Sequence, residues 1–208
     1  MLDRTRRFKW FNAACFLALA TVSVSFGVAY LLKGSFFEPI LVSDLRSFGG
    51  TTFEDIRNLE LWRLASAQLV HAKIPHMLFN ALFLFLLGSL LEQTIGSLRL
   101  IFLWLVAGGL ATLISPVLIA APWNVGTGAS QAVFAFAGCA VVFAISGVVD
   151  RRQAFALAAL YSATGLALDL AFAGYPKPGH VSGFIFGSAF GAIFLRLRPD
   201  ARFSQHAN

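Results

Sequence analysis

Repeated long apolar stretches constrain what this chain can fold into more than any other feature of its sequence. Hydrophobic residues make up 58% of the 208 positions and charged residues only 12%, whereas about a quarter of an average soluble domain is charged. A helix needs about 20 consecutive, mostly apolar residues to cross a bilayer. Lipid offers no hydrogen-bond partners to the backbone, so such segments must be helical. The sequence therefore predicts an all-α membrane protein.

Six membrane-spanning helices are predicted from these stretches. They cover residues 11–32, 68–92, 97–120, 126–149, 153–173 and 178–196. One long polar loop, residues 33–67, follows the first span, and all later connections are short. No internal repeat or linker divides the chain. We therefore expect one six-helix bundle over 11–196, preceded by a basic segment at 1–10 and followed by a tail at 197–208.

The basic residues give the chain a net charge of +6, but most of them flank the apolar stretches, so no nucleic-acid partner is implied. Lys and Arg are enriched in short cytoplasmic loops. The side that carries both termini would hold Arg4, Arg6, Arg7, Lys9, Arg99, Arg151, Arg152, Arg196, Arg198 and Arg202. The opposite side would hold Lys33, Arg46, Arg57, Arg63, Lys73 and Lys177. The lipid bilayer is thus the expected partner, with both termini cytoplasmic and loop 33–67 outside. Short loops and a single bundle suit a bacterial inner membrane.

Few ionisable or strongly polar residues lie within the predicted spans. Because such residues are unfavourable in lipid, they mark candidate functional positions. They are His71, His76, Asn80, Glu92, Ser130, Asp169 and His180. The second, fourth and sixth spans all run from outside to inside, and they carry His76, Ser130 and His180 in their outer parts, within a layer about 10 Å deep. A shared depth permits a single site.

Ser130 ends the segment Gly126-Thr127-Gly128-Ala129-Ser130, where the fourth predicted span begins. Glycines allow a tight backbone turn, and the first N–H groups of a helix have no partner within it. A serine in this position can attack a carbonyl while its own N–H binds the oxyanion. For a lone serine, a helix cap or a small packing residue is the more common explanation.

His180 begins the sixth predicted span, in which Gly183, Gly187 and Gly191 recur at intervals of four. Small residues at this spacing let helices approach closely in lipid. If the partner is the fourth span, the imidazole can reach Ser130 and accept its proton near neutral pH. Alone, a histidine in this position is more often a hydrogen-bonded structural residue.

His76 and Asn80 lie four residues apart and therefore share one helix face, which can present two hydrogen-bond donors. His71 lies five residues before His76, so within a continuous helix it is expected to point away. No His-Glu-x-x-His sequence occurs, which makes a zinc protease an unfavoured alternative.

Together these motifs resemble those of the rhomboid family of intramembrane serine proteases, in order, over residues 62–191. Five elements carry the resemblance: Trp62-Arg63; His76-Met77-Leu78-Phe79-Asn80; Gly88 with Glu92 and Gly96-Ser97; Gly128-Ala129-Ser130; and His180-Val181-Ser182-Gly183 with Gly187. In turn they are similar to the family's loop signature, its His-x-x-x-Asn helix, the glycine, acid and turn that follow, the Gly-x-Ser nucleophile motif and the catalytic histidine helix. The family's six-span fold also fits.

The resemblance implies a role for each matching residue. Ser130 would be the nucleophile and His180 the general base, while His76 and Asn80, with the Ser130 N–H, would form the oxyanion hole. Structural roles are expected for Arg63, Glu92, Gly128, Gly183 and Gly187. The family's dyad implies no acidic third member, no metal and no cofactor.

Three residues depart from the family pattern or lie outside it. Gln131 stands where rhomboids most often have a glycine after the nucleophile, and its bulk would narrow the site or supply a polar contact. Phe134 stands where a tyrosine commonly supports the histidine ring, so it keeps the ring and lacks the hydroxyl. Asp169 matches no family motif, and we expect it to pair with a loop group near the outer end of the fifth span.

The implied function is that of an intramembrane serine endopeptidase that cleaves transmembrane protein substrates in or near their membrane segments. One alternative is a catalytically inactive rhomboid-like protein that binds membrane clients, for which Gln131 is the best support. Another is a small transporter with a proton path through His76, Asp169 and His180, which the lack of an inverted repeat disfavours. The sequence specifies neither the substrate nor an oligomeric state.

Overall fold

A computed structural model describes residues 12–36 and 38–197, and within them the fold is almost entirely helical. Its elements in chain order are α1 (Ala13–Lys33), η1 (Asp44–Phe48), α2 (Phe53–Arg57), α3 (Arg63–Ser66), α4 (Ile74–Ile95), α5 (Ser97–Leu103), η2 (Trp104–Gly108), α6 (Gly109–Ile114), α7 (Ser130–Ile145), α8 (Arg151–Ala173) and α9 (Pro178–Arg196). One isolated antiparallel bridge joins Thr51 to Gly126. The predicted N-terminal segment 1–10 and residues 198–208 of the predicted tail lie outside the described residues.

Within residues 12–36 and 38–197, five helical segments are long and apolar enough to cross a membrane. They are α1, α4, α8, α9 and the continuous run Ser97–Ile114, which comprises α5, the π-helical segment η2 and α6. The fourth predicted span corresponds to α7, which has only 16 residues and is therefore about 24 Å long. The prediction of an all-α membrane protein is confirmed, while the count of six spans stays a prediction.

Two of the predicted span boundaries are wrong by six residues, whereas the others lie within four residues of the prediction. α4 begins at Ile74 rather than at residue 68. The third span ends at Ile114 rather than at residue 120, because Pro116 follows and a proline has no backbone N–H with which to continue the helical hydrogen bonds. α9, by contrast, begins and ends at the predicted residues. Parts of the loops 68–73 and 115–125 line the cavity that contains Ser130.

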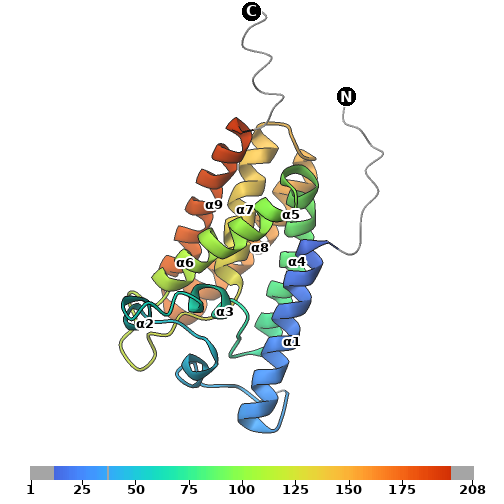
Figure 1. Cartoon of the computed structure of the whole chain (residues 1–208). Coiled ribbons are helices and arrows are strands. Elements are labelled where there is room, and N and C mark those ends of the chain that lie inside the picture. The colour runs from blue at the N-terminus through green and yellow to red at the C-terminus, as the bar shows by residue number, and fades with distance from the viewer. Residues whose placement is uncertain (1–11, 37, 198–208) are drawn as a thin grey trace, which may run out of the picture.

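α7 forms the centre of the bundle, and most of its residues are buried. α9, α8 and α4 pack against it (Figure 1). Glycines bring α7 and α9 into backbone contact: a Cβ at Gly187 would overlap the carbonyl of Ala135, and one at Gly183 would overlap that of Gln131. This close approach sets the separation of the side chains that begin the two helices.

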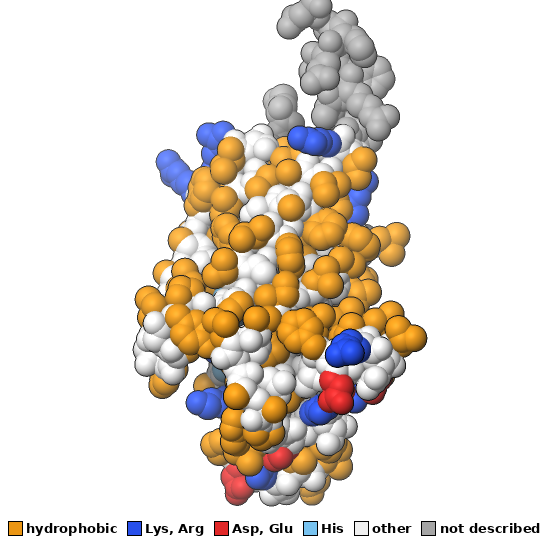
Figure 2. All heavy atoms as spheres, turned by 90° about the vertical axis from the view of Figure 1, so that its left-hand side faces the viewer, with side chains coloured by type: hydrophobic (Ala, Val, Ile, Leu, Met, Phe, Trp, Pro, Cys, Tyr) orange, Lys and Arg blue, Asp and Glu red, His pale blue; other side chains and the backbone are white. Residues whose placement is uncertain are grey.

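The two ends of the bundle differ in composition. α9 ends towards one end, whereas α2 and α3 of loop 33–67 lie towards the other (Figure 1). Figure 2 shows a broad hydrophobic belt between these ends, with Lys and Arg at both ends and Asp and Glu near the loop end of this face. Such a belt is expected where a bundle contacts lipid.

Glu92, near the end of α4, binds the beginning of α1. Its carboxylate oxygens accept hydrogen bonds from the backbone N–H groups of Ala13 at 2.9 Å and Ala14 at 3.0 Å. These N–H groups have no partner within the helix, and a negative charge near them is favoured by the helix dipole. The contacts support the structural role expected for Glu92.

Replacing Gly187 with alanine should destabilise the bundle. The added Cβ meets the Ala135 backbone, so α7 and α9 must separate, and overpacking of this kind costs about 1–3 kcal/mol of unfolding free energy. Gly27→Ala in α1 is a matched control, because nothing lies within 4 Å of that position and alanine favours a helix. Unfolding of both variants in micelles with increasing SDS would measure the difference. Equal stability of Gly187→Ala and the wild type would contradict the packing described.

Candidate active site

The backbone that leads into α7 is held by loop 33–67. Gly126 and Thr51 exchange two N–H···O hydrogen bonds of 2.7 and 3.0 Å, and the Gly128 N–H donates to the Ala67 carbonyl at 2.8 Å. Gly128 has a φ of +92°, a conformation that favours glycine. The turn delivers Ser130 as the first residue of α7, so its N–H has no partner within the helix.

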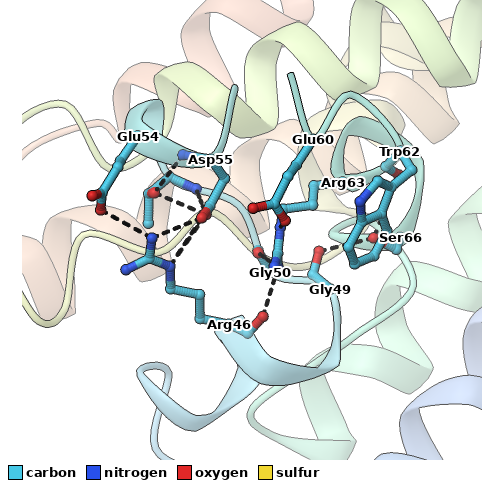
Figure 3. A network of polar contacts seen from close by, with 10 residues as sticks. Arg46, Gly49, Gly50, Glu54, Asp55, Glu60, Trp62, Arg63 and Ser66 are labelled. Atoms are coloured by element: carbon cyan, nitrogen blue, oxygen red, sulfur yellow. Dashed lines mark hydrogen bonds and ion pairs between the residues drawn. The ribbon is translucent and has the colours of Figure 1, made fainter. Parts of the chain in front are cut away.

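Arg63 stabilises the part of loop 33–67 that precedes Thr51 (Figure 3). Its Nη1 donates to the carbonyls of Arg46 at 2.6 Å and Gly50 at 2.8 Å, and its Nε pairs with Glu60 at 2.6 Å. Gly50 directly precedes Thr51, so these bonds fix the segment that pairs with Gly126. The placement supports the structural role expected for Arg63.

Arg46 belongs to the same network and binds the buried Asp55 (Figure 3). The Nη2–Oδ1 distance is 2.7 Å, and Thr52 donates to Oδ2 from its N–H and from its hydroxyl, each at 2.8 Å. Burial raises the pKa of the Asp55 carboxyl, but the hydrogen bonds from Arg46 and Thr52 outweigh this effect and hold the pKa below its usual value. Asp55 is therefore ionised at neutral pH and holds α2 to η1.

Ser130 and His180 meet near the starts of α7 and α9. The Oγ of Ser130 lies 3.0 Å from Nε2 of His180, and both side chains are buried. The ring of Phe134, one turn further along α7, stacks on the imidazole with centroids 4.5 Å apart and an interplanar angle of 21°. The structure thus brings the two residues of the predicted dyad within hydrogen-bond range, with Phe134 against the histidine ring.

Asp169 of α8 lies on the other side of the same imidazole. Its Oδ2 is 2.6 Å from Nδ1 of His180 and accepts a hydrogen bond from the Lys177 N–H at 2.9 Å, while the Lys177 ammonium lies 3.5 Å from Oδ1. Because Lys177 precedes α9, the expected pairing of Asp169 with a loop group is present. The sequence did not predict the contact with His180.

Asn80 is buried and held by two side chains. Its Nδ2 donates to Nε2 of His71 at 3.1 Å, and its Oδ1 accepts from the Tyr161 hydroxyl at 2.8 Å. An amide nitrogen carries two hydrogens, so one remains for a ligand. The Ala129 N–H donates to the same His71 nitrogen at 3.1 Å. His71 therefore connects Asn80 to the turn before Ser130.

The expectation that His71 points away from His76 is wrong. Because α4 begins at Ile74, His71 belongs to the preceding loop and helical rotation does not apply; the two ring centroids are 5.8 Å apart. Since Nε2 of His71 accepts hydrogen bonds, Nδ1 carries the proton and donates to Ser25 Oγ at 3.1 Å, whose hydroxyl donates to the Leu69 carbonyl at 2.7 Å.

One cavity of about 690 Å³ brings the predicted site residues together. Its polar lining includes His76, Asn80, Ser130 and His180. Its volume lies in the range of about 300–1,000 Å³ that is typical of ligand pockets. Ser130, His180, His76 and Asn80 thus border one space.

Gln131 supplies a polar contact to the serine that precedes it. Its Oε1 accepts from the Ser130 hydroxyl at 3.1 Å, and its Nε2 donates to the Ser115 hydroxyl at 3.1 Å. The Ser130 hydroxyl has only one hydrogen, so Gln131 Oε1 and His180 Nε2 compete for it.

Tyr161 and Asp169 could have been recognised from one pattern in the sequence. Tyr161, Gly165 and Asp169 recur at intervals of four and therefore share the face of α8 that packs inward. Gly165 lies on this face because Phe134 leaves no room for a Cβ there. The pattern marks a buried face, but it does not say which helix that face contacts.

The geometry defines a helical membrane protein with a serine and a histidine in contact beside a cavity, and the comparisons place it in a family. The family model described as Rhomboid domain matches residues 58–197. The chain belongs to the rhomboid family.

Several curated proteins are similar to this chain. Rhomboid protease GlpG of Haemophilus influenzae is 29% identical over 154 residues, which cover 68% of this chain and 74% of the relative. Rhomboid protease AarA of Providencia stuartii is 24% identical over 188 residues, which cover 77% of this chain and 65% of the relative. RHOMBOID-like protein 2 of Arabidopsis thaliana is 29% identical over 186 residues, which cover 83% of this chain and 57% of the relative. The chain thus spans less than two thirds of the last two relatives.

Family membership and the protease relatives support intramembrane protease activity in general. Together with the apolar helices, they support an integral, multi-pass membrane protein.

Loop 33–67 should open at acidic pH, and at a higher pH when Arg46 is replaced. Because the folded pKa of Asp55 is lowered, its contribution is present above the unfolded pKa of about 3.9 and is lost as the pH falls through the folded pKa. Arg46→Met removes the cation and its hydrogen bonds, so opening should begin about half to one pH unit higher. Cleavage of the loop by an acid-active protease across this range would measure the shift.

Arg57→Met is the matched control for this shift, because Arg57 is exposed on α2 and the charge change is the same. Loop 33–67 of Arg57→Met should open at the same pH as that of the wild type. Identical profiles for Arg46→Met and Arg57→Met would contradict the role given to the Arg46–Asp55 pair.

Tyr161→Phe should destabilise the protein although the ring is retained. The buried Oδ1 of Asn80 loses the hydroxyl that donates to it, and an unpaired buried acceptor costs about 1–3 kcal/mol. Tyr30→Phe in α1 removes the same atom from an exposed side chain and should change nothing measurable. SDS-driven unfolding would compare the two variants, and a wild-type midpoint for Tyr161→Phe would show that the hydroxyl does not hold Asn80.

Proposed function

We propose that this chain is an intramembrane serine endopeptidase with Ser130 as nucleophile and His180 as general base. The observation that carries the proposal is the 3.0 Å contact between Ser130 Oγ and His180 Nε2 beside a cavity. A base that accepts a proton from a nucleophile is expected within about 2.6–3.2 Å of it. The stacked ring of Phe134 limits the rotation of the imidazole and so favours this orientation.

We assign the oxyanion hole to the Ser130 N–H, Asn80 and His76. The N–H begins α7 and lacks an intrahelical partner, and Asn80 keeps one amide hydrogen beyond its bond to His71. His76 lines the same cavity. Donors held in place before the reaction stabilise the negative charge that develops on the substrate carbonyl.

The proposed reaction is acyl transfer followed by hydrolysis. Ser130 Oγ bonds to the substrate carbonyl carbon while its proton passes to His180 Nε2. That proton then goes to the leaving amine as the peptide C–N bond breaks. Water then attacks the acyl carbon while His180 Nε2 takes its proton, and His180 returns that proton to Ser130 Oγ as the acyl ester bond breaks. Because the peptide must be extended to be attacked, helix-weakening residues such as glycine in a substrate membrane segment should favour cleavage.

We also propose a bacterial inner membrane as the setting, with both termini in the cytoplasm. Within the described residues, Arg99 lies in the first turn of α5, Arg151 and Arg152 begin α8, and Arg196 ends α9, so all four lie beside short connections or the end of α9, opposite loop 33–67. Enrichment of basic residues in short loops favours the cytoplasmic side for that end. The cavity with Ser130 would then face the outer side.

The proposal predicts that cleavage and active-site labelling both depend on Ser130. Purified protein in liposomes should cleave a transmembrane model substrate and react with a fluorophosphonate probe. Ser130→Ala should abolish both, and His180→Ala should lower cleavage by a factor of at least about 10²–10⁴, the usual contribution of a general base. Ser162→Ala is the matched control, because the Ser162 hydroxyl has no hydrogen-bond partner among the described residues. Cleavage by Ser130→Ala at the wild-type rate would contradict the proposal.

The alternative is a rhomboid-like protein that binds membrane clients without cleaving them. Gln131 is the observation that favours it, since Oε1 competes with His180 for the Ser130 hydrogen. A folded wild-type protein that neither reacts with the probe nor cleaves, but binds the same model substrate, would support this alternative. Recovery of activity in Gln131→Gly would identify the glutamine as the cause.

A further inference from the structure

Asp169 is a buried carboxylate surrounded by hydrogen-bond donors. Its side chain is 2% exposed. Oδ2 lies 2.6 Å from Nδ1 of the His180 ring and accepts a hydrogen bond from the Lys177 N–H at 2.9 Å. A buried carboxylate with such partners stays ionised in preference to losing them, and an ionised carboxylate can only accept hydrogen bonds. Nδ1 of His180 must therefore carry a hydrogen.

This assignment determines the state of the nitrogen that faces Ser130. With the hydrogen on Nδ1, a neutral imidazole leaves Nε2 as an unprotonated acceptor. Nε2 can then take the Ser130 hydrogen at 3.0 Å. In the opposite tautomer Nε2 would be a donor, and the Ser130 hydrogen would turn to Gln131 Oε1 at 3.1 Å. The hydrogen-bond partner of Ser130 thus depends on the group opposite Nδ1.

We propose that Asp169 is a positioning residue that holds His180 in the tautomer able to accept the Ser130 proton. This inference rests on the serine endopeptidase mechanism proposed above. During attack the proton moves from Ser130 Oγ to His180 Nε2, while the Nδ1 hydrogen stays on the ring and Asp169 remains ionised. The carboxylate also lies 2.6 Å from the positive charge that forms on the imidazolium.

A second function of the same carboxylate is structural and must be separated from the first. By accepting from the Lys177 N–H, Asp169 also joins the end of α8 to the start of α9. A purely structural role would weaken folding and substrate binding without selecting a tautomer. The two roles therefore differ in kcat and in the state of the His180 ring.

Asp169→Ala tests the proposal in the full chain, in liposomes, with a transmembrane model substrate. We expect kcat to fall on the order of 10²–10⁴-fold, as for other losses of a histidine-orienting carboxylate, with KM within threefold of the wild type. Asp150→Ala is the matched control, because Asp150 caps the opposite end of α8 by accepting from the Gln153 N–H at 2.8 Å. It should weaken α8 and leave kcat within threefold. A kcat for Asp169→Ala within threefold of the wild type would overturn the proposal.

Nitrogen-15 NMR of the histidine rings gives a readout that does not depend on turnover. The wild-type His180 signals, assigned by comparison with His180→Ala, should show a protonated Nδ1 and an unprotonated Nε2. In Asp169→Ala the ring should shift towards protonated Nε2 or a mixture. An unchanged, Nδ1-protonated ring in this variant would overturn the proposal.

Asp169→Asn carries the test if the alanine variant does not fold. Because the Lys177 N–H points at the Oδ2 position, the amide oxygen is expected there, so that acceptor is kept, while the charge and the contact of Oδ1 with the Lys177 ammonium are lost. We expect a smaller fall in kcat, about tenfold or more, with the wild-type tautomer retained. A wild-type kcat in Asp169→Asn would show that the negative charge of Asp169 does not contribute to kcat. Full cleavage by Ser130→Ala would instead refute the serine mechanism, and the NMR result would still decide the tautomer.

Discussion

The geometry of the whole site depends on the backbone contact between α7 and α9. In lipid there is little hydrophobic force between helices, so close packing through small residues is what holds them together. Gly183, Gly187 and Gly191 meet the backbone of α7 at successive turns, near Gln131, Ala135 and Cys139. Contacts at three levels fix both the separation and the rotation of the helices. Ser130 and His180 lie near the starts of these helices, so this packing also fixes the relative position of their side chains.

The remaining residues of the site are held from outside the central helices. Loop 33–67 contains an ion-pair network of the kind found in soluble proteins, in which Arg63 holds the Gly50 carbonyl and Thr51 pairs with Gly126. His71 then connects the turn before Ser130 with Asn80. Ser130, the proposed nucleophile, is thus positioned by the polar contacts of loop 33–67 on one side and by helix packing on the other.

The sequence predicted α9 and the meeting of Ser130 with His180, and it predicted that Asp169 pairs with a loop group, but it did not predict the contact of Asp169 with His180. Pro178 and the basic end at Arg196 are local signals, so both ends of α9 could be placed. Leu69, Val70 and Ala72 are apolar although they are not helical, so the predicted second span began too early and gave His71 the wrong direction. Asp169 lies on a recognisable inward face of α8, but periodicity does not identify the helix opposite. The helix that faces Asp169 can be identified only from the packing of the folded bundle.

The shortness of α7 has a consequence for the membrane around it. A helix of 16 residues, about 24 Å long, does not fill a hydrocarbon layer about 30 Å thick. The missing thickness must be occupied by irregular chain, which lipid tolerates only where protein satisfies its polar groups. Here the N–H groups of Gly126, Gly128 and Ala129 are satisfied. They donate to the Thr51 carbonyl, the Ala67 carbonyl and Nε2 of His71, respectively. The cavity beside Ser130 therefore lies where the central helix is shorter than the hydrocarbon layer, and the proposed hydrolysis would not require water to cross the full thickness of the lipid.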